Sequence, residues 1–289
     1  MGYPPSVSRP PYVVDPEDPR APSQELWDVM SDEERARVVD ALPSEIESAY
    51  PPEGDAHRKA KDGPLGALDA YFRRIGRRVY LSSNLPVYYP GERLFAPDLI
   101  AVLDVEPHER DRWVTSHERR GLDLALEVLY RGDDRKDLQR NVERFARLGI
   151  AEYFIYDRKR GRLQGYVLEE GDTLYSRIVP QQGRWPSRVL GLEVTLEGDR
   201  LRLYSGTAAV PDLEELATRG ERLLGDAIAR VEEAEKRAEQ EAQRAEQEAR
   251  RAEQEAQRAE QEAQRAEQEA RRADRAEREL AALRADRQS

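Results

Sequence analysis

The sequence predicts an α/β domain over residues 23–211, with a proline-rich segment at residues 1–22 before it and a long charged helix over residues 212–289 after it. Two alternating patterns predict the domain. One is short runs that are rich in β-branched residues, Leu and Tyr, and the other is segments whose apolar residues recur at helical spacing. A third pattern, a repeat of seven residues that begins at Ala238, predicts the long helix.

The composition excludes several classes of protein. There is no cysteine, so disulfides and thiolate metal sites are excluded. No apolar run approaches the length of about 20 residues that a membrane span needs, and no secretory signal is visible, so we expect a cytoplasmic protein that does not enter membranes. The net charge of -11 argues against a broad electrostatic footprint for nucleic acid, although it allows a local basic cleft.

The first elements follow from prolines and a capping pattern. Seven prolines within residues 1–22 prevent a helix or a central strand, which predicts an extended or disordered segment. Ser31 and Glu34 form a capping-box pattern, and we expect a short helix to follow it through Val38 and Val39.

A second helix is predicted to begin at Pro64, which suits a first helical turn, and to end at Gly76. Its apolar residues recur at helical spacing: Leu65, Leu68, Phe72 and Ile75.

Short segments of strand composition then dominate, with one helix among them. The helix is expected over residues 134–148, ends before Gly149, and has an inward stripe made of Leu138, Val142, Phe145 and Leu148. The strands are expected at residues 78–82, 98–104, 122–130, 152–157, 162–168 and 173–179, with two more near 189–196 and 200–204. Three strands, a helix and further strands predict a mixed sheet with helices packed on it.

The tail repeats AEQEAQR or AEQEARR from Ala238 onward. Its residues are strong helix formers, and alanine occupies the a and d positions of the heptad. An alanine seam buries little apolar area, and glutamates such as Glu239 and Glu241 at e and g oppose like charges in a parallel homodimer. Within one chain, Glu246 can pair with Arg250. A solvated single helix and a thin coiled coil both remain open.

Two carboxylates stand out as candidates for chemistry. Asp98 follows Pro97 and opens an apolar strand, while Glu127 lies inside the apolar run LALEVL, where burial costs several kcal/mol unless the group is paired, protonated or bound to a metal. Two such groups at one end of a sheet suit a hard cation such as Mg²⁺. A polar helix start at residues 133–137 follows the strand that carries Glu127. The alternatives are a strand-start cap for Asp98 and a buried arginine partner for Glu127.

Several segments together resemble one family. They are PDLIAVLDV (97–105), LALEVL (124–129), DLQRNVERFARLGIAEYFIYD (137–157), GRLQGYVL (161–168) and RRVYLSSNLPVYY (77–89). Over residues 65–205 the chain resembles the Uma2 family of restriction-endonuclease-like proteins, in the PD-(D/E)xK nuclease superfamily. The resemblance implies a restriction-endonuclease-like fold, a divalent metal (Mg²⁺ or Mn²⁺) and activity on DNA phosphodiesters. It also implies that Asp98 and Glu127 are the motif acids that bind the metal.

The lysine of the family motif is missing. The position two residues after Glu127 is Leu129, and the helix position at which many relatives carry a lysine is Asn141. Asn141 shares the inward face of its helix with Leu138 and Phe145, but it supplies no charge. Lys136 has the right chemistry and lies roughly opposite the inward stripe, so it would need a late or bent first turn.

Two functions follow. The first is a Mg²⁺-dependent endonuclease-like domain in which Lys136 orients the attacking water or stabilises charge. The alternative is a catalytically inactive nuclease-fold scaffold that acts through its helical tail, which the residues Leu129 and Asn141 favour. Residues 212–289 serve in either case as a spacer or an interaction arm, for a protein partner or for weak self-association.

Other candidates are weaker. A zinc site is not expected at the three histidines, which lack metal-ligand spacing: His57, His108 and His117. A phosphate-facing edge is possible on the helix over 134–148, but solvated charge is the favoured interpretation for Arg140, Arg144 and Arg147. Core positions in a strand, rather than base stacking, are expected for Tyr153, Phe154 and Tyr156.

Overall fold

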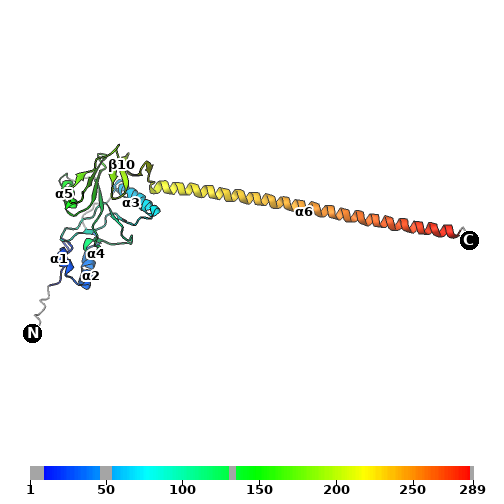
Figure 1. Ribbon diagram of the computed structural model, residues 1–289, viewed down its shortest axis with the longest axis horizontal. Coiled ribbons are helices and arrows are strands. Elements are labelled where there is room, and N and C mark those ends of the chain that lie inside the picture. The colour runs from blue at the N-terminus through cyan, green and yellow to red at the C-terminus, as the bar shows by residue number, and fades with distance from the viewer. Residues whose placement is uncertain (1–9, 46–53, 130–134, 287–289) are drawn as a thin grey trace, which may run out of the picture. The chain divides into compact units, whose positions relative to one another are not determined.

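The computed structural model describes residues 10–45, 54–129 and 135–286, without the side chains of residues 56, 135–138, 277 and 279–286. The chain divides into two compact units, Met1–Leu216 and Ala217–Ser289. The first unit contains every strand and all the short helices of the described residues, and the second consists of one long helix (Figure 1).

A six-stranded mixed sheet forms the centre of the first unit. Its strands in spatial order are β1 (Val79–Ser82), β3 (Leu99–Leu103), β5 (Leu124–Leu129), β6 (Glu152–Asp157), β7 (Arg162–Val167) and β8 (Ser176–Arg177). Only β5 and β6 pair in parallel, and the helix α5 (Arg135–Arg147) lies between them in sequence, as a parallel crossover requires. The predicted α/β class with a mixed sheet flanked by helices is therefore confirmed.

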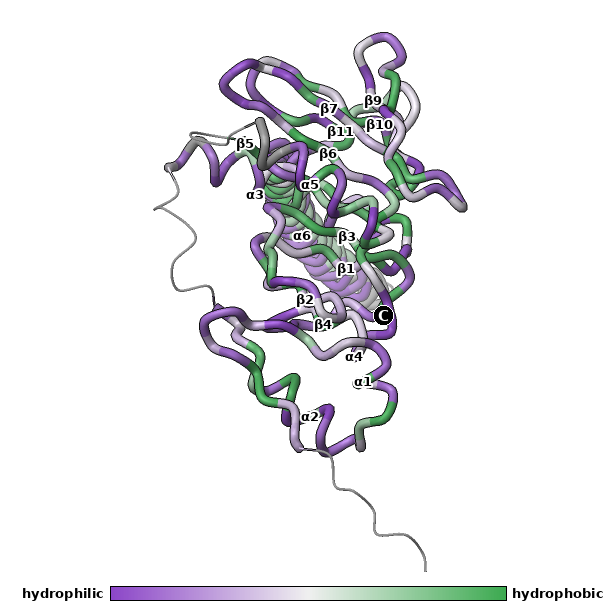
Figure 2. Tube along the Cα trace, turned by 90° about the vertical axis from the view of Figure 1, so that its left-hand side faces the viewer, coloured by the Kyte–Doolittle hydropathy of each residue, from purple (hydrophilic) through white to green (hydrophobic). Residues whose placement is uncertain are grey.

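Alternation along the strands gives the sheet two apolar faces. Leu99, Leu124 and Leu126 pack with Leu68 and Phe72 of the helix α3 (Asp55–Ile75). On the other face, a second cluster contains Ile100, Ala125 and Tyr153 together with Phe145 of α5. Figure 2 shows these hydrophobic stretches along the strands of the first unit. The sheet is consequently covered by a helix on each side.

A smaller sheet of four strands covers the α3 side of the molecule further. Its strands are β12 (Ala208–Ala209), β11 (Arg200–Ser205), β10 (Leu192–Glu197) and β9 (Trp185–Ser187). Val194, Leu201 and Leu203 from this sheet join the same core as Phe72. The sequence predicted the strands at 189–196 and 200–204 but not that they form a sheet of their own.

The amino-terminal part packs around a third, separate core. This core takes residues from α1 (Gln24–Asp28), α2 (Asp32–Ala41), β2 (Val87–Tyr88) and β4 (Trp113–Val114). β2 and β4 pair in parallel, and α4 (Thr115–Glu118) follows β4 directly. The capping box at Ser31 and Glu34 is confirmed, because each residue binds the backbone N–H of the other. Residues 10–22 form no helix and make isolated bridges to Arg93 and Pro90. The rest of the predicted proline-rich segment, residues 1–9, lies outside the described residues.

The helix α3 runs from Asp55 to Ile75, so the predicted start at Pro64 is wrong. Gly54 is the N-cap, and Pro64 lies in the helix interior. A proline there removes one backbone hydrogen bond, but the helix continues because its buried face packs on the sheet on both sides of the proline, through Ala60 and Ala67. The predicted end is confirmed: Gly76 adopts the left-handed conformation with φ 69°.

The other main-sheet predictions hold closely. The strands expected at 78–82, 98–104, 122–130, 152–157 and 162–168 appear within two residues at each end, whereas that at 173–179 shortens to β8. The helix α5 has Phe145 buried, with Val142 and Leu148 packed beside it, as the stripe predicts; the side chain of Leu138 lies outside the described part. Tyr153, Phe154 and Tyr156 are core residues, as expected.

The long helix α6 extends from Leu213 to Asp286 and confirms the predicted helix. The expected pair of Glu246 and Arg250 forms, at 2.7 Å, and three more pairs with the same spacing of four residues occur along α6. Within the described residues, no helix combines the length and apolarity that crossing a membrane requires.

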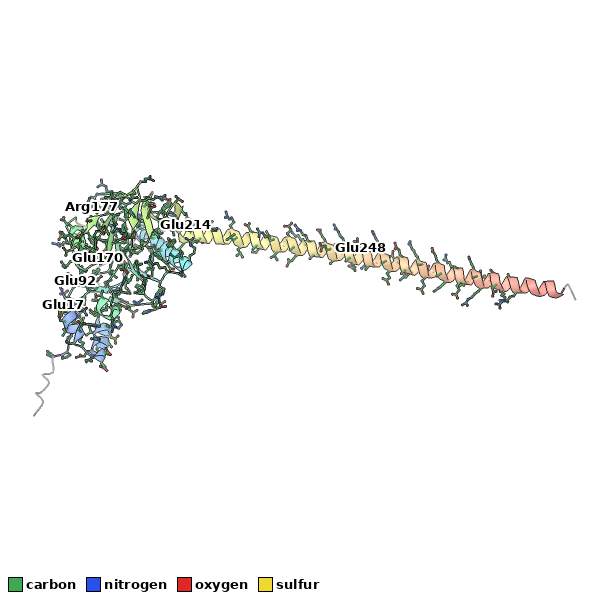
Figure 3. The ribbon with its side chains drawn as sticks, viewed as in Figure 1. Glu17, Glu92, Glu170, Arg177, Glu214 and Glu248 are labelled. Atoms are coloured by element: carbon green, nitrogen blue, oxygen red, sulfur yellow. The ribbon has the colours of Figure 1, made fainter. Side chains whose placement is uncertain are left out.

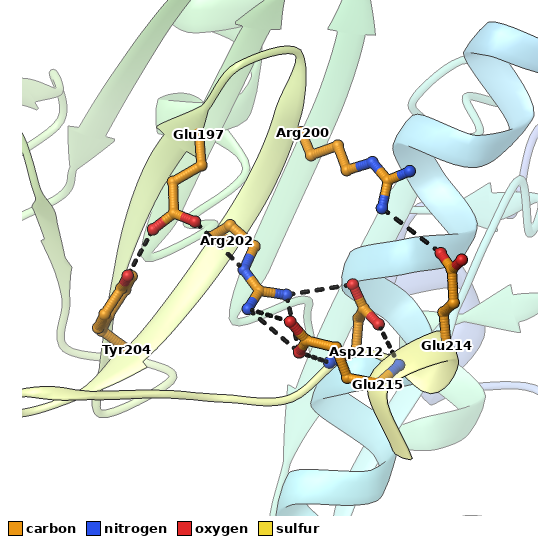
Figure 4. A network of polar contacts seen from close by, with 7 residues as sticks. All are labelled: Glu197, Arg200, Arg202, Tyr204, Asp212, Glu214 and Glu215. Atoms are coloured by element: carbon orange, nitrogen blue, oxygen red, sulfur yellow. Dashed lines mark hydrogen bonds and ion pairs between the residues drawn. The ribbon is translucent and has the colours of Figure 1, made fainter. Parts of the chain in front are cut away.

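The first turn of α6, which belongs to the first unit, is joined to β11 by an ionic network around Arg202 (Figure 4). The guanidinium binds Glu215 at 2.9 Å and Asp212 at 3.1 Å, and Glu197 lies 3.6 Å away. Asp212 and Glu215 also accept each other's backbone N–H groups, which caps the first turn. One half-buried arginine therefore joins the small sheet to the first turn of α6.

Candidate active site

The two predicted acids lie at the same end of neighbouring strands. β3 and β5 are antiparallel, with Leu99 paired to Leu126, so the start of β3 adjoins the end of β5. Asp98 precedes β3 directly, and the register extended by one residue places it opposite Glu127. The Val128 N–H donates a hydrogen bond of 2.7 Å to Asp98 Oδ2. This bond ties the carboxylate of one candidate to the strand that carries the other.

Asp98 is buried, at 6% exposure, against the first turns of α3. Its Oδ1 atom lies 3.2 Å from His57 Nε2 and 3.7 Å from Lys61 Nζ. His57 and Lys61 are four residues apart in α3, a spacing that places both side chains on one face of the helix. The Lys61 residue is only 2% exposed, so the ammonium group is held inside the protein beside the carboxylate.

Glu127 is half-buried, and its neighbours come from β6 and α5. Burial raises the pKa of the Tyr153 hydroxyl well above its usual value, the charge of Glu127 raises it further, and Asn141 lowers it. These effects place Glu127, Tyr153 and Asn141 near one another. Asn141 therefore faces the sheet, as predicted from its helical position.

The predicted lysine is not tested. Lys136 belongs to the first turn of α5, but its side chain lies outside the described residues. Leu129 packs beside the core on the α5 side, so the position two residues after Glu127 supplies no charge. The role of Lys136 in orienting water or stabilising charge remains a prediction from the sequence.

The donors present fit a hard divalent cation better than zinc. Among the residues that the structure describes, no group of three or more His, Cys, Asp and Glu residues could hold a metal ion. Mg²⁺ commonly uses one or two carboxylates and fills its other positions with water and substrate phosphate oxygens. Asp98 and Glu127 are two carboxylates on adjacent strands, of which Asp98 contacts α3 and Glu127 lies near Tyr153 and Asn141.

A basic hollow of about 490 Å³ opens beyond the ends of β5 and β6. Leu129 and Val142 line it on the α5 side, next to the region of Glu127 and Asn141. Three arginines also line it, namely Arg160, Arg162 and Arg177, and its one acid, Asp157, pairs with Arg160 at 2.8 Å. Arg177 belongs to β8 and is labelled in Figure 3. The hollow therefore carries an excess of positive charge in a protein whose net charge is negative.

Two helix arginines are used elsewhere. Arg144 and Arg147 of α5 both pair with Glu92, at 3.3 and 3.0 Å, and Arg144 lies over the Phe95 ring. Glu92 is marked in Figure 3. These contacts fix α5 to the loop before β3, so neither the phosphate-facing edge nor the solvated-charge interpretation describes Arg144.

Comparison with protein families decides the relationship. A family model named Uma2, described as "Putative restriction endonuclease", matches residues 32–202, more than half of the chain. The chain belongs to the Uma2 family. The Uma2 region includes Asp98, Glu127, Asn141 and both contacting residues of α3, and it ends before α6. The first unit is thus a nuclease-like domain, and the long helix is an addition to it.

Two further comparisons give less. A crystal structure titled as a putative nuclease belonging to DUF820 from Anabaena variabilis ATCC 29413 is similar, with a TM-score of 0.40 and 12% identity. The similarity covers 53% of this chain and 89% of that one. A search of curated proteins gives no match.

The sequence analysis missed Lys61 as a site residue and weighed His57 only as a zinc ligand. Their spacing of four residues is a detectable signal once both are assigned to one helix. The assumption that the helix begins at Pro64 left both residues outside it. The structure thus adds an imidazole and an ammonium group to the surroundings of Asp98.

Proposed function

We propose that the first unit is a Mg²⁺- or Mn²⁺-dependent endonuclease that hydrolyses DNA phosphodiesters. The observation that carries the proposal is the buried Asp98 carboxylate, hydrogen-bonded to Val128 N at 2.7 Å, directly beside Glu127 in the strand order. Membership of the Uma2 family supports it. Asp98 and Glu127 would hold the metal, which supplies an activated water and neutralises charge that develops on phosphate.

The residues of the chain have distinct parts in this proposal. The Val128 N–H orients Asp98 and leaves its other oxygen directed at α3. Arg162 and Arg177 in the basic hollow would bind the phosphates that flank the cleaved bond. Hydrolysis forms a bond between a water oxygen and phosphorus and breaks the bond from phosphorus to the leaving deoxyribose oxygen. The leaving oxygen takes up one proton, and the attacking water loses one to solvent.

A Mn²⁺ titration of Glu127→Gln tests the metal site. The exchange keeps the size of the side chain but removes its charge, so we expect Mn²⁺ to bind at least about tenfold more weakly than to the wild type. Glu143→Gln is the matched control, because Glu143 is an exposed acid of α5 in the same neighbourhood. The cleavage of supercoiled plasmid DNA in Mg²⁺ should be lost in the first variant and kept in the second. Equal Mn²⁺ affinity in both variants and the wild type would show that Glu127 is not a metal ligand.

The scaffold alternative keeps one specific observation in its favour: the positions at which relatives carry the lysine are Leu129 and Asn141, both uncharged. A wild-type protein that binds Mn²⁺ through Glu127 but cuts no DNA substrate would support this alternative.

We also propose that α6 associates weakly with a second copy of the chain. Leu224, Ile228 and Val231 are exposed at 63%, 51% and 58%, and they continue the d, a and d register of the alanine seam. Sedimentation equilibrium should show an average mass that rises with concentration, and less so for Ile228→Glu. Arg230→Glu, which lies outside the seam, should behave as the wild type. A mass that stays monomeric throughout identifies the helix as a spacer.

A further inference from the structure

A lysine outside the family motif, Lys61, lies beside the proposed site. The motif positions themselves carry Leu129 and Asn141. Lys61, from a different helix, has its Nζ atom 3.7 Å from Asp98 Oδ1. α3 brings this ammonium group to the same carboxylate that Val128 N holds from the sheet.

The burial of Lys61 needs an explanation. At 2% exposure its side chain is among the largest fully buried in the described protein. A buried ammonium group is costly even when it is paired, and such pairs often contribute less to stability than apolar residues of the same volume. Elsewhere the inner face of α3 is filled by apolar side chains, namely Ala60, Leu68 and Phe72. A lysine retained at the edge of the sheet, against a candidate metal ligand, fits a role in chemistry better than a role in packing.

We propose that Lys61 is the active-site lysine of this domain, delivered from α3 in place of the missing motif lysine. The inference rests on the proposed nuclease function. The Lys61 ammonium group would donate a hydrogen bond to a non-bridging oxygen of the attacked phosphate and stabilise the negative charge that grows there during hydrolysis. His57, four residues earlier on the same face of the helix, contacts the same Asp98 Oδ1 atom at 3.2 Å.

The same placement has a consequence for the metal. A positive charge fixed beside Asp98 repels a cation bound by that carboxylate. Removal of the Lys61 charge should therefore strengthen metal binding while it weakens catalysis. A lysine that only fills space would change neither property beyond its effect on folding. These opposite changes separate the two roles.

The test uses the full-length chain with Lys61→Met, Lys61→Arg and Lys59→Met. Methionine keeps the length of the side chain without its charge, arginine keeps the charge, and Lys59 is an exposed lysine of the same helix. We expect Lys61→Met to bind Mn²⁺ about tenfold more tightly and to cleave DNA about 100-fold more slowly. Lys61→Arg should retain the Mn²⁺ affinity of the wild type. Lys59→Met should match the wild type in both Mn²⁺ affinity and the rate of DNA cleavage.

The outcomes separate this inference from the proposed function. If the wild type cuts DNA and Lys61→Met cuts it equally well with unchanged Mn²⁺ affinity, the inference on Lys61 is wrong and the nuclease function stands. If no protein cuts DNA but Lys61→Met still binds Mn²⁺ more tightly, the nuclease function fails and Lys61 remains the cation of the metal pocket. Should Lys61→Met not fold, Lys61→Gln carries the same expectations.

Discussion

Substitution of Glu152 by alanine should destabilise the first unit by about 3 to 5 kcal/mol. Glu152 is 1% exposed at the start of β6, and its carboxylate accepts hydrogen bonds from Ser187 Oγ, Arg188 N and Val189 N. These donors belong to the end of β9 and the turn that follows it, so one side chain joins the small sheet to the main sheet. Alanine leaves buried donors unsatisfied, each at a cost of about 1–3 kcal/mol.

Urea denaturation of the full-length chain measures this effect, with Glu169→Ala as the control. Glu169 pairs with the side chain of Arg188 at 2.7 Å, but both side chains are largely exposed, at 46% and 71%. Its loss should cost about 0–1 kcal/mol. Similar losses for the two variants would mean that the buried hydrogen bonds of Glu152 contribute no more than a surface pair.

The same residue gives a pH dependence of known sign. Burial raises the pKa of Glu152 above its ordinary value of 4.5, and the hydrogen bonds from Ser187, Arg188 and Val189 only partly oppose this. Between 4.5 and the raised pKa, the folded state holds a proton that the unfolded state has released. The free energy of unfolding must therefore fall as pH rises through this window. Glu152→Gln lacks this titration, so the advantage of the wild type over that variant should shrink with rising pH; an advantage that is flat or grows contradicts the shift.

Local pattern was sufficient for most of the main sheet. Residues 152–157 were predicted to the residue, because the apolar run EYFIYD follows a glycine that ends a helix. β2 and β4 were not predicted, since each has two residues and exists through pairing with a partner distant in the sequence, Val87 with Trp113. Periodicity over so short a segment contains no signal, and the pairing depends on the tertiary fold.

The candidate site divides in a similar way. Asp98 and Glu127 are visible in the sequence because a carboxylate in or beside an apolar strand is costly. The same rule applies to Glu152, whose carboxylate makes hydrogen bonds that hold the fold together. The rule therefore finds buried acids but does not separate a metal-binding acid from a structural one. Lys61 was missed for a different reason. A proline normally marks the first turn of a helix, and only the packing of α3 on the sheet shows that Pro64 lies within one.

Replacement of Arg202 by alanine should cost about 2 to 3 kcal/mol. The side chain is 13% exposed, and its hydrogen bonds to Glu215 raise the pKa of the guanidinium further. Without it, the carboxylates of Glu197, Asp212 and Glu215 remain close together with no cation between them. The partial exposure of Glu197 and Glu215, at 48% and 49%, keeps the loss below the value of about 3–5 kcal/mol that is typical of a broken buried ion pair.

Arg200→Ala is the matched control on the same strand. Arg200 pairs with Glu214 at 3.6 Å, but the two side chains are 63% and 80% exposed, so its removal should cost less than about 0.5 kcal/mol. Hydrogen exchange would locate the difference: the amides of the first turn of α6 should exchange faster in Arg202→Ala than in Arg200→Ala, because only the former loses the side chain that joins β11 to Asp212 and Glu215. Equal exchange in the two variants would show that the capping bonds between Asp212 and Glu215 hold this turn without the arginine. The arginine would then neutralise charge in the network without fixing the start of the long helix.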